Sequence, residues 1–228
     1  MICLIMVLSL LVGCGDSEAK KEMTSAIESA NELLENGDKP YDASKQDALE
    51  AAIASADEAK DDDAYKTVTE NINSAAKEYE DSVKQLQQVT NPEEAFLIER
   101  VKAVDSITDV EAATEETDAN KLMNKPGGYT SYIAMKSSLI EDEYGYYKDM
   151  SPVEAGTEGG AVIEAFPTEE DAQARNEYLA TFDGAGMLSS GSHTVVGTLV
   201  IRTSSELTAT QQKELETSII EALIKLDE

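Results

Sequence analysis

The only histidine of the chain, His193, directly follows the serine-rich run SSGS at residues 189–192. A histidine that takes a proton from a serine hydroxyl could support nucleophilic catalysis. These serines lie in a glycine-rich segment, however, and not on the strained strand-to-helix turn that presents the nucleophile in many hydrolases. We therefore favour His193 as a surface residue at the start of a strand, and we predict that the chain is not an enzyme. A hydrolase or accessory subunit that uses His193 with nearby serine or acidic residues remains the alternative.

Aromatic side chains gather in the segment EDEYGYYKDM, residues 141–150, which holds three of the nine tyrosines in a chain without tryptophan. Exposed tyrosines are rigid, amphipathic contact residues, and they are enriched in interfaces. We predict that this loop contacts a ligand, although one or two of its rings could instead pack beneath the loop onto a sheet. The predicted ligand-contacting residues are Tyr129, Tyr144, Tyr146, Tyr147 and His193.

Two acidic clusters contain oxygen ligands of the kind that Ca²⁺ prefers. One is the run 61–63, and the other consists of Glu115, Glu116, Asp118 and Asn120. Neither cluster has the ligand spacing of an EF-hand loop. Because runs of like charge usually lie in solvated turns, we predict no metal site.

The charge balance restricts the partners of this protein. The 228 residues include 46 acidic and 18 basic residues, for a formal net charge of −28, and the basic residues are scattered apart from Lys20-Lys21. Nucleic acid and anionic lipid headgroups both require a basic patch. The glycine pairs at 127–128 and 159–160 precede predicted strands, whereas a phosphate-binding loop lies between a strand and a helix. We thus predict no nucleic-acid partner and no cofactor.

The segment MICLIMVLSLLVG, residues 1–13, is apolar, uncharged and too short for the roughly 20-residue helix that crosses a bilayer. Its small residues before Cys14 are typical of a signal-peptide cleavage site. The four residues that end this segment resemble the lipobox of bacterial lipoproteins: Leu11, Val12, Gly13 and Cys14. An ordinary secreted protein that is cleaved near Gly15 is the alternative.

The lipobox resemblance implies transfer of a diacylglyceryl group to the Cys14 thiol and cleavage before this residue. Two acyl chains hold a protein stably on a membrane, whereas a single chain binds reversibly. We therefore expect a mature protein on the extracellular face of the cell membrane, attached to lipid through its covalent anchor. Residues 14–22 would form the lipidated tether.

Residues 23–107 are predicted to form an antiparallel helical bundle. Apolar residues recur at three- and four-residue steps over 18–36, 43–60 and 64–88, and the connections between these segments are short. A fourth helix is predicted to begin at Asn91-Pro92, because Asn is a good N-cap and Pro suits the first helical turn.

The helical segment carries a second resemblance. The runs YDASKQDALEAAIASADEAK (41–60) and TVTENINSAAKEYEDSV (67–83) resemble the FIVAR-type three-helix modules of Gram-positive surface proteins. This resemblance implies a spacer or a binding repeat at a cell surface, here present in a single copy.

Residues 108–228 are predicted to form a small α+β domain. The runs 130–136, 160–166 and 193–202 are typical of strands. Thr168 and Thr208 are predicted helix N-caps, because Asp171 and Gln211 occupy the capping-box position. We expect a mostly antiparallel, three-stranded sheet with helices on one face, related to the ferredoxin-like fold but one strand short.

The acidic stretch 107–122 is predicted to be a partial helix followed by a loop. The runs NKPGGYTSYIAM and SSGSHTVVGTLVIRTS resemble domains of uncharacterised lipoproteins from Firmicutes, and this resemblance implies no activity. The features of the whole chain predict a membrane-anchored lipoprotein that acts as a binding or interaction module of the cell envelope. Its partner would be a cell-wall glycan or a protein, and an envelope-associated hydrolase is the alternative.

Overall fold

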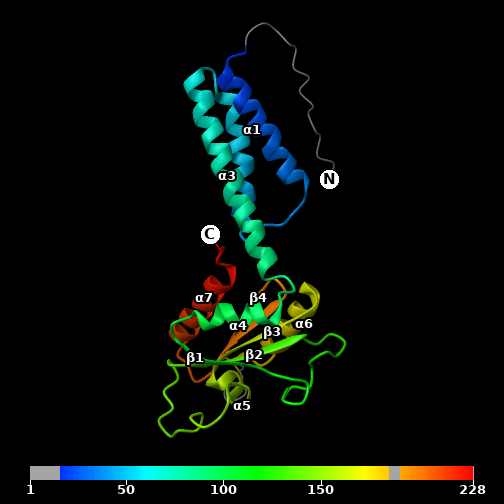
Figure 1. The fold of residues 1–228 in the computed structure, drawn as a ribbon, viewed down its shortest axis with the longest axis vertical. Coiled ribbons are helices and arrows are strands. Elements are labelled where there is room, and N and C mark those ends of the chain that lie inside the picture. The colour runs from blue at the N-terminus through cyan, green and yellow to red at the C-terminus, as the bar shows by residue number, and fades with distance from the viewer. Residues whose placement is uncertain (1–15, 185–190, 228) are drawn as a thin grey trace. The chain divides into compact units, whose positions relative to one another are not determined.

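The computed structural model describes residues 16–184 and 191–227, which form two compact units that divide after Ser82 (Figure 1). The predicted signal peptide, Cys14 and the serines at 189 and 190 lie outside the described residues. Within the described part of the chain, no helix is long and apolar enough to cross a membrane.

The first unit is helical. It contains α1 (Glu18–Glu35), α2 (Ser44–Ala54), a 3₁₀ turn (Ser55–Glu58) and most of α3 (Asp62–Gln88), whose last turns belong to the second unit. Because α1 begins at Glu18, the predicted tether overlaps the first helix. The buried seam is rich in small and branched side chains: Ala19, Met23, Ala26, Ala30, Leu49, Val68, Ile72 and Tyr79. Small residues let the helix backbones approach closely.

The second unit has an α+β fold, as predicted. Its helices are the last turns of α3, α4 (Glu94–Lys102), α5 (Pro152–Ala155), α6 (Glu169–Ala180) and α7 (Ala209–Ile224), with a 3₁₀ turn at Gly156–Gly159. Its strands are β1 (Ile107–Ala112), β2 (Ser131–Ser137), β3 (Gly160–Ala165), β4 (Ser192–Val196) and β5 (Leu199–Thr203). They form one sheet in the order β1-β2-β3-β5-β4, and every neighbouring pair is antiparallel.

The sheet has five strands, so the prediction of three strands in a ferredoxin-related order was wrong. Strand β1 occupies part of the stretch that was predicted to be a helix and a loop. A register shift between Ile107 and Asp109 breaks the alternation of apolar residues that would otherwise mark a strand. The predicted single strand 193–202 folds back on itself at Gly197, which has a φ of 57°, and forms the β4–β5 hairpin.

Helices cover both faces of the sheet, not one face as predicted (Figure 1). Helices α4 and α7 pack on the face that presents Ile133 and Met135, whereas α6 packs on the face that presents Ala134. The reason is that β2, β3 and β5 are buried along nearly their whole length. Strands that are apolar on both sides need a layer on each side.

Helix caps follow local sequence signals. The Thr208 hydroxyl accepts from the Gln211 N–H while the Gln211 side chain accepts from the Thr208 N–H at 2.9 Å, which completes the predicted capping box. The Thr168 hydroxyl likewise accepts from the Asp171 N–H at 3.1 Å.

The prediction that Asn91 caps α4 was wrong. Its φ is 49°, its N–H donates to the Thr198 hydroxyl, and the helix begins three residues later, at Glu94, with Glu93 as N-cap.

The hairpin turn at Gly197 generates the first testable prediction. A Cβ atom at this position would lie 2.3 Å from the Val89 carbonyl oxygen, in a backbone conformation that side chains rarely adopt. We expect Gly197→Ala to lower the free energy of unfolding by about 2–4 kcal/mol. Gly145→Ala is the matched control, because Gly145 has a φ of 72° in open space and should lose only about 1 kcal/mol. Equal losses in urea denaturation would contradict the close packing at Gly197.

Candidate functional site

Two tyrosines of the predicted contact loop project into solvent. The side chain of Tyr144 is 77% exposed and that of Tyr146 is 69% exposed, the largest exposures of any large hydrophobic residue in the described chain. Their ring centroids lie 5.9 Å apart at an interplanar angle of 53°. A tilted ring pair of this kind presents two amphipathic surfaces side by side.

The backbone beneath this ring pair is held by charged side chains. The two Asp142 carboxylate oxygens accept from the N–H groups of Tyr146 and Tyr147, at 2.7 and 2.8 Å. The Lys136 ammonium at the end of β2 donates to the carbonyl oxygens of Lys148 and Met150. The loop is therefore ordered by polar contacts rather than by burial of the exposed rings.

The third loop tyrosine has a different environment. Tyr147 is half-buried. Burial, together with the nearby carboxylates of Glu206 and Glu158, raises the pKa of the Tyr147 hydroxyl. Tyr147 is therefore less exposed than Tyr144 and Tyr146 and does not belong to the exposed pair.

Tyr129 lies in the core and not with the exposed pair. It has no exposed surface and contacts Tyr132 and Phe166, with ring centroids 5.6 and 5.9 Å away. Its hydroxyl donates to the Asp118 carboxylate at 2.5 Å. A buried ring with a satisfied hydroxyl cannot reach a ligand at the surface, so we do not include Tyr129 in the candidate contact surface.

The same carboxylate organises the turn that was considered for Ca²⁺. Asp118 is 2% exposed and accepts from the N–H groups of Asn120, Leu122 and Met123 at 2.8 to 3.0 Å. Burial opposes the ionised form, but these bonds and that from Tyr129 outweigh it and lower the pKa of Asp118. Among the described residues, no group of three or more acidic, histidine or cysteine side chains is placed to hold a metal ion.

His193 of β4 is held by one side chain of α6 and by one from the residues that follow this helix. Its side chain is 7% exposed, and its Nδ1 and Nε2 atoms lie 2.7 Å from Asn176 Oδ1 and 3.2 Å from Asp183 Oδ1. The described neighbouring serine, Ser192, donates its hydroxyl to Glu216 instead. Both ring nitrogens thus contact side chains other than a serine.

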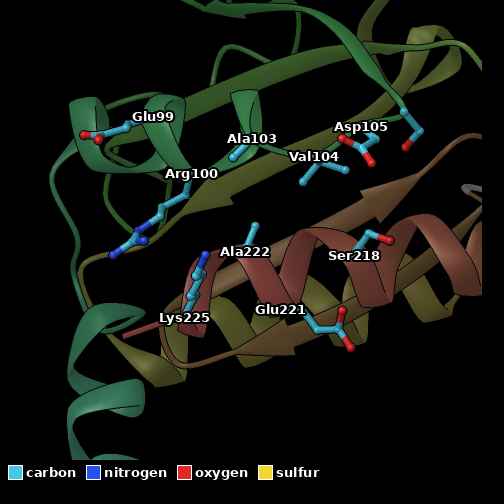
Figure 2. Close-up of a pocket in the computed structure, with 10 residues that line it drawn as sticks. Glu99, Arg100, Ala103, Val104, Asp105, Ser218, Glu221, Ala222 and Lys225 are labelled. Carbon is cyan, nitrogen blue, oxygen red and sulfur yellow. The ribbon is translucent and has the colours of Figure 1, made fainter. Parts of the chain in front are cut away.

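A groove of about 520 Å³ lies along the outer side of the α4–α7 pair (Figure 2). Its apolar lining residues are Ala103, Val104 and Ala222. Below it, α4 and α7 are joined by Leu97, Val101 and Ile219, which are all fully buried. A hollow of this size over a rigid core is within the range of small-ligand sites.

Opposite charges line the two ends of this groove. Arg100 and Lys225 lie together at one end, whereas Asp105 lies at the other end with Ser218 (Figure 2). Two more carboxylates belong to the lining: Glu99, next to Arg100 on α4, and Glu221 on α7. The Arg100 guanidinium stacks over the Phe96 ring at 5.0 Å and is only 14% exposed. Local sequence patterns do not predict this groove, because its two walls are far apart in the chain.

The groove and the tyrosine loop share one structural junction. The Ser138 N–H, directly after β2, donates to the carbonyl oxygen of Ser106 at 2.8 Å. Ser106 follows Asp105 in the sequence and is one of the residues that line the groove. The segment that leads from β2 into the tyrosine loop is therefore hydrogen-bonded to a residue of the groove lining.

Comparisons with protein-family models, with curated proteins and with solved structures found no match for this chain.

The buried Asp118 turn leads to a pH-dependent prediction. Asp118→Asn removes a charged acceptor from four hydrogen bonds, and we expect it to cost about 1–3 kcal/mol of stability at neutral pH. Because the folded pKa lies below the unfolded value of about 3.9, this difference is complete above about pH 4. It disappears as the pH falls through the folded pKa.

Urea denaturation of both proteins from pH 7 to pH 2.5 measures this difference. Asp149→Asn serves as control, since Asp149 is exposed in the neighbouring loop. A constant difference between wild type and Asp118→Asn at all pH values would contradict the assignment.

Proposed function

We propose that this protein is a membrane-anchored lipoprotein of the cell envelope that acts as a binding module through its tyrosine loop. The observation that carries the proposal is the exposed Tyr144–Tyr146 pair on a loop ordered by Asp142 and Lys136. Exposed rings are costly to solvate, and a loop that is ordered in advance loses little conformational entropy on binding. A cell-wall glycan or a protein surface is the class of partner that stacks on such rings.

Membrane anchorage rests on sequence features that lie outside the described residues. The motif Leu11-Val12-Gly13-Cys14 supports processing as a lipoprotein, and the high net negative charge keeps the exported part soluble without a disulfide. The FIVAR-like helices would then separate the binding unit from the anchor. We favour this function over a hydrolase because both nitrogens of His193 contact Asn176 and Asp183.

The tyrosine loop is tested by removing its two exposed rings. We expect the double variant Tyr144→Ala/Tyr146→Ala to lose at least about tenfold in affinity on an array of glycans and peptidoglycan fragments. The detergent-extracted full chain is used for wild type and variant alike. Binding that is equal in the two proteins, or absent from both, would refute the assignment of the loop.

Two further variants separate ring contact from loop order. Tyr178→Ala removes a tyrosine that is 55% exposed on α6, and it should leave binding unchanged. Asp142→Ala retains both rings but removes the acceptor of two backbone bonds, so it should weaken binding by about three- to tenfold.

The anchor is tested separately at Cys14. We expect mass spectrometry of the native protein to show a diacylglyceryl group on an N-terminal Cys14, and Cys14→Ala to release the protein from the membrane fraction. A native N-terminus further along the chain, without lipid, would show secretion without an anchor. That result would leave the loop assignment unaffected.

A further inference from the structure

We propose that the groove between α4 and α7 binds a short peptide with a free amino terminus and a free carboxylate. The cationic end would take the carboxylate and the acidic end the ammonium. This site is separate from the tyrosine loop, and the proposal goes beyond the function proposed above.

The cationic end has the chemistry of a carboxylate site. Arg100 and Lys225 come from two different elements and converge there (Figure 2), in a chain with more than twice as many acidic as basic residues. Within the described part of the chain, the Lys225 ammonium has no ion-pair partner. The guanidinium and the ammonium together offer several donors to one anion.

A carboxylate of the chain itself already uses this end. The Asp227 side chain, which is 82% exposed, accepts from Arg100 Nη2 at 3.0 Å. The contact shows that Arg100 can bind a carboxylate that approaches from solvent. Because Asp227 is exposed and Arg100 is largely buried, an incoming carboxylate can displace it at little cost.

The acidic end has the chemistry of an ammonium site. Asp105 makes no side-chain hydrogen bond or ion pair with any other described residue. The Ser218 hydroxyl donates to the Glu214 carbonyl at 2.9 Å, so its remaining lone pairs can only accept. A carboxylate and a hydroxyl acceptor together suit an ammonium donor.

The distance between the two ends selects the length of the ligand. Ser218 and Lys225 are separated by seven residues along α7, which corresponds to about 10 Å at 1.5 Å per residue. An extended peptide spans at most about 3.3–3.6 Å per residue. A zwitterion of two or three residues fits this spacing, whereas a single amino acid is too short.

Titration calorimetry of the full chain with unblocked trialanine tests this proposal. We expect saturable binding that weakens at least about fivefold when the peptide is N-acetylated or C-amidated, because each block removes one charged contact. No binding of trialanine, or equal binding of free and blocked peptides, would overturn the proposal. Loss on amidation without loss on acetylation would reveal an anion site only and would also overturn it.

Single variants test which end of the groove binds each terminus of the peptide. Lys225→Gln should abolish the preference for the free acid over the amide, and Asp105→Asn should abolish the preference for the free amine over the acetylated form. Ala222→Leu fills the groove and should prevent binding, with the circular dichroism spectrum checking the fold. Lys102→Gln and Glu214→Gln are the charge-matched controls on α4 and α7, outside the groove lining.

Asp227→Asn is expected to strengthen peptide binding, whereas the variants above weaken it. Removal of the internal carboxylate should tighten trialanine binding by about two- to fivefold, whereas Glu214→Gln, with the same change in charge, should not. Equal tightening in both would indicate a general effect of charge and would overturn the assignment of the Arg100 end. The Tyr144→Ala/Tyr146→Ala variant should bind trialanine normally, so failure of one site is distinguishable from failure of the other.

Discussion

The Glu164 carboxylate lies within the central strand β3 and has no surface exposed to solvent. A charge in such a place is tolerated only when it is paired and hydrogen-bonded. Arg175 of α6 donates to it from Nε and Nη2 at 2.7 and 2.8 Å, and Arg202 of β5 donates from Nη1 at 3.1 Å. The Arg175–Glu164 pair thus joins α6 to the centre of the sheet, beside the apolar contacts of Ala172 and Leu179.

The network gives the two faces of the sheet different properties. Arg202 lies directly opposite His193 in the β4–β5 ladder, and Asn176 follows Arg175 on α6, so His193 belongs to the rim of the same polar layer. The opposite face is held by a large apolar cluster together with polar contacts to α7: Ser192 donates to the Glu216 carboxylate, and Gln88 donates to the Leu223 carbonyl oxygen. On the outer side of α4 and α7, Asp105 and Lys225 form no ion pair with another described residue. They are available for a ligand along the groove.

Local signals made part of this fold predictable. The caps at Thr168 and Thr208 and the strands near 130–136 and 160–166 depend on residues within one or two turns of each other, and the structure contains them. The edge strand β1 was missed because its bulge shifts the phase of the apolar residues. The β4–β5 hairpin was missed because its turn interrupts a run of β-branched residues with a single glycine, Gly197, although that glycine was the available signal.

The candidate site likewise contains features that depend on residues close in sequence and features that depend on distant ones. The exposure of Tyr144 and Tyr146 follows from a loop whose stabilising carboxylate, Asp142, lies only a few residues away, so composition alone identified it. Tyr129 has the same residue type, but its burial depends on how the Asp118 turn packs over the sheet, which no local pattern encodes. The groove is harder still to predict from sequence, because its lining comes from residues 99–106 and 218–225, which are far apart in the chain. A sequence thus indicates which residues could contact a ligand more readily than it indicates a groove. A groove depends on how elements that are distant in the chain pack against each other.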